Sequence, residues 1–224
     1  MRSSLRIMAI IGIYLGAQLS WAIDEKPCAE SLKEFRLNTL FKEGADAYAK
    51  SLNLNLSVSD VKVLPREGKD KIPLLGKTVK SVLISIKDVD GKTIAYSRVN
   101  IEAVKKFGIT RGYRATFVKS ETFGEANKGQ YLSLATYKKF FEMHPEITEL
   151  YGELVLDNAR AFAKAYDNIP KTSDENKAFE DAIKETHMYR SMSRFGFSQL
   201  DLKKSSMKPG VLQKYNVVVV LKRP

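Results

Sequence analysis

The stretch "ETFGEANKGQYLSLATYKKFF", residues 121–141, places two glycines and a lysine directly before a run with the apolar spacing of a helix. The beginning of a helix offers unpaired backbone N–H groups and the positive end of the helix dipole, and both favour an anion. Gly129 permits close backbone approach to a ligand, and Lys128 adds positive charge. Asn127, Lys128, Gly129 and Gln130 are therefore candidate phosphate-binding residues. The alternative is a turn that binds nothing.

The first 22 residues, "MRSSLRIMAIIGIYLGAQLSWA", have the features of a secretory signal peptide. Two arginines precede an apolar stretch from Ile7 to Leu19, and small residues end the segment at Ala22. The apolar stretch is shorter than the about 20 residues that span a bilayer. We expect cleavage after Ala22 and export of the mature chain, Ile23–Pro224, to the periplasm or the medium. An uncleaved anchor is the alternative.

The composition of the chain favours an anionic partner. The net charge is +11, and the segment from Leu202 to Pro224 holds six lysines or arginines and no acid. Such a surplus favours phosphates, lipid head groups or acidic polymers, and an anionic ligand of the cell envelope would suit an exported protein. The alternative is a solvated face that aids solubility. No pattern typical of nucleic-acid binding occurs.

Metal and nucleophile chemistry find little support in the sequence. His144 and His187 show no metal-ligand spacing with each other or with Cys28, so we expect no metal site. With a single cysteine the chain cannot form an internal disulfide. No Gly-x-Ser-x-Gly elbow occurs.

Hydrophobic patterning predicts one α+β domain with a mostly antiparallel central sheet flanked by helices. Residues 23–78 supply a helix over Ala29–Leu52, a short strand in "SVSDVKVLP" and a basic loop, "REGKDKIPLLGK". Residues 79–224 form the rest of the core. Within it, Asp90-Gly91 is a strong turn signal between the strands "VKSVLISIK" and "KTIAYSRVNIE", which predicts a hairpin.

The remaining elements follow in order along the chain. We expect a strand in "GYRATFVKS", a helix over Gln130–Met143, a strand in "ITELYGELVL", a helix in "NARAFAKAY", a helix in "AFEDAIKETHMYRSMSRF", a strand in "GFSQLDL" and a last strand in "KYNVVVVLK". Asp157 or Asn158 could cap the second of these helices.

Several of these stretches together resemble the GNAT superfamily of N-acyltransferases, from about Val79 to Leu221. "VLISIKDVDGKTIAYSRV" is similar to the central hairpin of that family, and "ATFVKSETFGEANKGQYLSLATY" to its acyl-CoA loop and following helix. "ELYGELVLDNARAFAKAY" is similar to the next strand and an Asn-led helix, and "SRFGFSQL" to the Gly-Phe ending before the last strands. The resemblance implies a GNAT-like fold and transfer of an acyl group to an amine acceptor. Acyl-CoA or another acyl-thioester would be the co-substrate, with no tightly bound cofactor.

The resemblance also implies a binding role for individual residues. Splayed strands beside the loop would hold the pantetheine arm, and residues 127–130 would hold the pyrophosphate, with Asn158 as a further cofactor-binding candidate. The usual loop of the family has Gln or Arg, two residues, Gly, one residue, then Gly or Ala. Here Gly124 and Asn127 replace the first two of these positions, and Gly129 keeps the last.

The resemblance also implies two catalytic roles, a proton donor and a general base. Tyr166 would donate a proton to the departing thiolate, with Tyr189 as a second candidate; the alternative for both is a packing role. Glu121 or Glu153 would be the general base that takes the proton of the amine; solvated carboxylates are the alternative. Three functions stay open: an exported acyltransferase-like enzyme, a GNAT-like module that binds an anion without catalysis, and an unrelated exported α+β protein.

Overall fold

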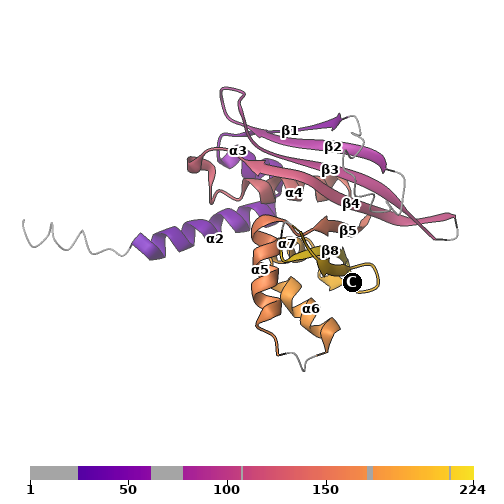
Figure 1. The fold of residues 1–224 in the computed structure, drawn as a ribbon. Helices are drawn as coiled ribbons and strands as arrows, with labels where there is room; N and C mark the ends of the chain where they lie inside the picture. Colours follow the sequence, from indigo (N-terminus) through magenta and orange to yellow (C-terminus); the bar gives the residue numbers. More distant parts are fainter. Residues whose placement is uncertain (1–24, 62–77, 107, 171–173, 212) are drawn as a thin grey trace, which may run out of the picture.

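The computed structural model describes residues 25–61, 78–106, 108–170, 174–211 and 213–224. The expected signal peptide and the basic loop at 66–77 lie outside the described residues. A sheet of eight strands forms the centre (Figure 1), in the order β1-β2-β3-β4-β5-β8-β6 with β7 paired to β8. The strands are β1 (Asn55–Val61), β2 (Thr78–Lys87), β3 (Thr93–Lys106), β4 (Ile109–Thr122), β5 (Ile147–Glu153), β6 (Gln199–Leu200), β7 (Ser206–Pro209) and β8 (Tyr215–Lys222).

The sheet is antiparallel except between β4 and β5, which run parallel. The helices are α2 (Glu25–Glu43), α3 (Ala45–Ser51), α4 (Leu132–Met143), α5 (Leu156–Asp167), α6 (Glu175–Lys184) and α7 (His187–Ser193), with a 3-10 turn at Glu125–Asn127. The expected α+β class, a mostly antiparallel sheet flanked by helices, is confirmed.

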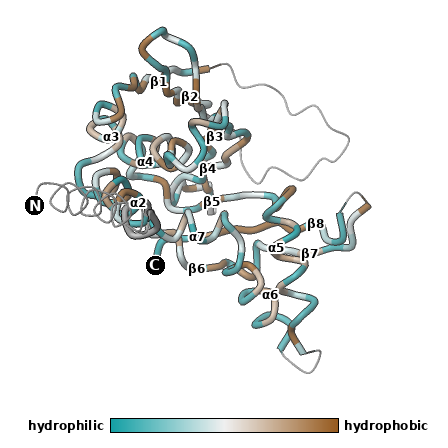
Figure 2. The backbone as a smooth tube through the Cα atoms, turned by 90° about the vertical axis from the view of Figure 1, so that its left-hand side faces the viewer, coloured by the Kyte–Doolittle hydropathy of each residue, from teal (hydrophilic) through white to brown (hydrophobic). Residues whose placement is uncertain are grey.

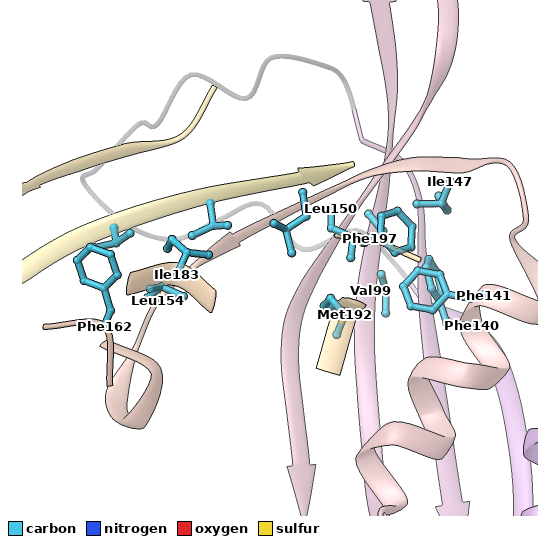
Figure 3. Packing of buried hydrophobic residues seen from close by; sticks show 14 of the residues in the cluster. Val99, Phe140, Phe141, Ile147, Leu150, Leu154, Phe162, Ile183, Met192 and Phe197 are labelled. Carbon is cyan, nitrogen blue, oxygen red and sulfur yellow. The ribbon is translucent and has the colours of Figure 1, made fainter. Parts of the chain in front are cut away.

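The main hydrophobic core lies between one face of the sheet and the helices that follow β4. Phe140 and Phe141 of α4 and Met192 of α7 lie near Val99 of β3, and Phe162 of α5 lies at the other end of the cluster beside Leu154 and Ile183 (Figure 3). A second cluster joins α2 and α3 to β2, β3 and α4. The helix expected over 29–52 is therefore present, although it is divided at Gly44, whose φ of 97° suits glycine.

Some details differ from the sequence-based expectations. Helix α5 begins at Leu156 with Val155 as its N-cap and no side-chain cap, so the prediction that Asp157 or Asn158 caps it was wrong. The helix expected over 178–195 is two helices, because the Thr186 hydroxyl accepts the N–H of Tyr189 and caps a new one.

A buried ionic network links β4 and β5 to the C-terminal segment, on the sheet face opposite the main core. Arg114 and Glu149 are 4% and 6% exposed, and an Arg114 guanidinium nitrogen lies 2.6 Å from a carboxylate oxygen of Glu149. Lys204 reaches the same carboxylate at 2.5 Å, and Lys222 pairs with Asp201 at 2.7 Å. Two of the six C-terminal cations, Lys204 and Lys222, are thus paired with carboxylates that have little exposure.

Two more of those cations are also engaged. Lys214 pairs with Asp167 at 2.5 Å, and the Arg223 guanidinium lies 4.6 Å from the ring centre of Phe197. The basic C-terminal segment therefore presents fewer free charges to an anionic partner than its composition indicates.

Candidate functional site

The loop between β4 and α4 is held at both ends. Where β4 ends, the Phe123 N–H donates to the Ile94 carbonyl at 2.7 Å. The Thr122 hydroxyl lies 3.0 Å from the Ser133 hydroxyl, which joins the end of the strand to the first turn of α4. The chain turns into the helix through Gly129 at φ 77° and Tyr131 at φ 53°. The sequence thus builds a strand–loop–helix junction at the expected place.

The first turn of α4 has unpaired donors. Tyr131 is the N-cap, and no side chain in the described residues caps this end. The first helical hydrogen bond runs from the Ala135 N–H to the Tyr131 carbonyl at 3.0 Å. The N–H groups of residues 132–134 therefore have no acceptor within the helix, and they lie at the positive end of its dipole. This end of α4 suits an anion.

A cleft of about 520 Å³ opens beside this turn. Its walls come from the loop, from Leu37 of α2 and from one face of α7. The lining residues are Leu37, Thr122, Asn127, Lys128, Gly129, Tyr131, Leu132, Ser133, Leu134, His187, Arg190, Ser191 and Arg194. Positive side chains thus converge from two elements on the unpaired donors of α4, while leucines supply the apolar part of the surface.

The positive charges of the cleft are only partly offset. The Lys128 ammonium lies 2.5 Å from a Glu125 carboxylate oxygen, and Arg190 pairs with Glu185. Arg194 is exposed and forms no ion pair within the parts of the chain that the structure describes. The cleft consequently keeps a net positive character beside the α4 N-terminus.

Three of the four predicted phosphate-binding residues line the cleft: Asn127, Lys128 and Gly129. A Cβ atom added at Gly129 would meet no atom within 4 Å, so the backbone is accessible there. Gln130 is not a lining residue. Its carbonyl accepts the Tyr48 hydroxyl, and its side-chain amide donates to the Ala126 carbonyl at 2.8 Å. Gln130 therefore holds the loop in place.

The predicted catalytic residues do not line the cleft. Tyr166 is half-buried on α5, with its ring 5.5 Å from that of Phe162 and 5.6 Å from that of Tyr215, and burial raises its pKa. Glu153 is exposed at the end of β5. The ring contacts of Tyr166 favour the packing alternative for this residue.

Glu121 faces the other side of the sheet. Its neighbours Ser120 and Thr122 contact residues on the α4 side, whereas its carboxylate accepts the Tyr96 hydroxyl at 2.9 Å and pairs with Lys119 at 2.8 Å. Hydrogen bonds from Lys119 and then Tyr96 hold the pKa of this carboxyl below its usual value. A carboxylate with a lowered pKa is a weaker general base.

Asn158 and Tyr189 hold α7 in place. The Asn158 side-chain carbonyl accepts the N–H of Met188 at 2.9 Å, and the Tyr189 hydroxyl donates to the Ser198 carbonyl at 3.0 Å. Asn158 therefore positions the helix that forms one wall of the cleft and is not itself a lining residue.

The sequence analysis missed the contribution of α7. His187, Arg190, Ser191 and Arg194 recur at intervals of three and four residues, which places them on one face of a helix. That spacing was the available signal. The spacing does not show which surface these four residues face, because the loop lies far away in the sequence.

No group of three or more His, Cys, Asp or Glu side chains that could hold a metal ion occurs among the described residues. No helix in the same part of the chain is long and apolar enough to cross a membrane.

Comparisons with known proteins give likenesses of structure only. No protein-family model matches the chain, and no curated protein matches it in sequence. One similar solved structure is the aminoglycoside 6'-N-acetyltransferase AAC(6')-Ih from Acinetobacter baumannii, at 10% identity and a TM-score of 0.32, over 54% of this chain and 94% of that one.

Two further structures cover more of the chain. Arabidopsis thaliana NAA60 in complex with acetyl-CoA matches at 8% identity and a TM-score of 0.40, over 76% of this chain and 100% of that one. A protein assigned as a phosphinothricin N-acetyltransferase matches at 12% identity and a TM-score of 0.38, over 76% of this chain and 99% of that one. The three likenesses are ones of fold.

Proposed function

We propose that this chain is an N-acyltransferase-like protein that binds the phosphate groups of an acyl-CoA or a related acyl-thioester in the cleft beside α4. The observation that carries the proposal is the convergence of the uncapped first turn of α4 with Lys128, Arg190 and Arg194 on one cleft. Backbone N–H groups at a helix N-terminus and guanidinium groups are both strong phosphate donors.

The central strands support the same proposal. The parallel pairing of β4 and β5 ends at Thr116 and Tyr151, but β4 continues to Thr122, and among the described strands this last part pairs only with β3. The two strands therefore part just before the loop. This is the divergence that the resemblance to N-acyltransferases implies beside an acyl-CoA loop.

We also propose that the acyl group of the bound thioester is transferred to an amine. The amine nitrogen would form a bond to the acyl carbon as the carbon–sulfur bond breaks. A base would take the amine proton, and the departing thiolate would gain one. Glu121, Glu153 and Tyr166 stay the predicted residues for these steps. An exported protein would meet little acyl-CoA, so export would favour another phosphate-bearing thioester as donor.

A second candidate function is binding of an anionic envelope ligand without chemistry. The observation that favours it is the position of Tyr166, Glu121 and Glu153, none of which lines the cleft. A turnover assay separates the two functions: release of free thiol from acetyl-CoA with a panel of amines, compared with the rate without protein. Binding with no excess thiol release would select the second function.

The binding site itself is tested by calorimetric titration of the protein with CoA. Gly129→Val should weaken binding more than Lys128→Ala, because a β-branched side chain obstructs the backbone whereas Lys128 is 66% exposed and already paired. A charge-assisted hydrogen bond is worth roughly 1.5–3 kcal/mol, so we expect about a 10-fold loss, the lower end of that range, for Lys128→Ala.

Gly91 offers a matched control for Gly129. The two glycines have φ of 78° and 77°, and neither has an atom within 4 Å of an added Cβ, so valine imposes the same backbone strain at both. Gly91→Val should reduce stability like Gly129→Val and leave CoA affinity unchanged. Equal affinity losses for the two variants, or millimolar binding by the unmodified protein, would refute the site.

A further inference from the structure

Helix α7 lies between α4 and α5, close to β5 (Figure 2). On the α4 side, the segment directly after α7 brings in the ring of Phe195. This ring lies 5.0 Å from that of Phe141, 6.5 Å from that of Tyr137 and 5.3 Å from that of Phe41 on α2. These contacts pack aromatic rings against one another on this side.

On the α5 side, α7 contacts both the strand and the helix. The Met188 N–H donates to Asn158 on α5, and a Cβ atom added at Gly152 on β5 would lie 3.0 Å from the Met188 sulfur. Met192, one turn later, is 5% exposed and belongs to the main core with Val99 and Phe197 (Figure 3). Helix α7 is thus packed into the fold along its length.

A ligand arm that passes between the diverging strands would need this space. Close-packed side chains leave no room for an extended chain, and removing Met192 from the core would expose buried apolar surface. The cleft itself lies between α7 and the loop with the first turn of α4, where His187, Arg190 and Arg194 face the loop. The structure therefore offers a place for phosphates but none for the pantetheine arm between the strands.

We infer that α7 closes the passage between β4 and β5, so that a ligand of the CoA class binds by its phosphorylated nucleotide end alone. This rests on the proposed function, because it concerns the same cleft. The lining suits such an end: the half-buried side chains of Leu37 and Leu134 offer an apolar surface for a base, and the cations with the α4 donors hold the phosphates.

Titration with CoA and with its two halves tests the inference. Adenosine 3′-phosphate 5′-diphosphate retains the nucleotide end, and pantetheine retains the arm. We expect the nucleotide to bind within about 3-fold of CoA, and pantetheine to show no binding at millimolar concentration. CoA binding more than about 10-fold tighter than the nucleotide would overturn the inference and leave the proposed function standing. Failure of all three ligands to bind would overturn both.

Charge substitutions on α7 supply a second readout. Arg194→Gln should weaken CoA and the nucleotide by the same factor, about 10-fold or more, because both present the same phosphates to it. Arg160→Gln is the matched control: Arg160 is an exposed arginine on α5 that pairs with Asp157 at 3.2 Å and does not line the cleft. An unchanged affinity for Arg194→Gln would contradict the inference.

Discussion

Lys128 and Arg194 meet at one cleft although they lie far apart in the sequence. The first could be predicted from the sequence because its setting is local: a glycine-bearing turn directly before a helix identifies a helix N-terminus without knowledge of the rest of the fold. The position of Arg194 at the cleft could not be predicted from the sequence. Its role depends on how α7 packs against the loop, and nothing in the spacing of the α7 residues says which surface they face.

Glu121 shows how one residue can reverse such a prediction. Phe117 and Val99 pair across β4 and β3, but the next pair is Lys119 with Arg98, so Val118 is an extra residue in β4. A one-residue bulge moves every later side chain to the opposite face. Simple alternation from Phe117, which packs against α4, would have placed Glu121 on the α4 side. The bulge places Glu121 on the face opposite α4.

Glu149 carries a prediction about stability. Burial by itself favours its neutral form, but hydrogen bonds from Lys204 and Arg114 outweigh burial, and the pKa of the carboxyl is lowered from its usual 4.5. A lowered folded-state pKa adds stability that is present above the unfolded pKa and is lost as pH falls through the folded one. Glu149→Gln should therefore cost about 3–5 kcal/mol near neutral pH.

Urea unfolding between pH 3 and pH 7 measures the free energy of unfolding of the unsubstituted protein and of Glu149→Gln. The unsubstituted protein should lose stability below about pH 4.5 more steeply than Glu149→Gln does. Glu180→Gln serves as the control, because its pair with Lys184 is a helix-surface pair of the kind worth about 0.5 kcal/mol or less. A Glu149→Gln cost as small as that of the control would show that the network contributes little.

At the scale of elements, locally encoded structure was predictable. The hairpin of β2 and β3 forms where Asp90-Gly91 indicated it, and the Asp88 carboxylate accepts the backbone N–H groups of Asp90 and Lys92 in the turn. The division between α6 and α7 was missed, although Thr186 has the residue type of an N-cap. An unbroken apolar periodicity across 178–195 concealed it.

Helix α2 shows the opposite error. The apolar spacing over its length indicated one buried face, but Leu32 is 48% and Phe35 is 64% exposed, whereas Leu40 is fully buried. The spacing of apolar residues indicates a face, and only tertiary structure decides how far a partner extends along it. The strand β7 was missed because four residues are too short to show a period, whereas β6 lies within the strand expected in "GFSQLDL".

At the scale of the whole molecule, the sheet order could not be derived from composition or periodicity, because it depends on pairings between distant segments. The sequence predicted the α+β class, and the resemblance to N-acyltransferases predicted the parting of two strands before the loop. Neither predicted that α7 would fill the space between α4 and α5. The packing of α7 is a property of the complete fold.

Export is a prediction about the whole chain, and it rests on residues 1–22. Their arginines, apolar stretch and small-residue end are typical of a cleaved signal, so the mature protein should begin at Ile23. Mass spectrometry of the protein from its native host measures the N-terminus. An intact Met1 on a protein confined to the cytosol would contradict export and restore cytosolic acyl-CoA as the donor.

The most direct measurement of the central claim is a crystal structure of the protein grown with CoA. We expect phosphate density within hydrogen-bonding distance of the N–H groups of residues 132–134, with the Arg190 and Arg194 guanidinium groups turned toward it and α7 in place. Crystals soaked at saturating CoA that show no density in this cleft, or phosphates bound elsewhere, would contradict the claim.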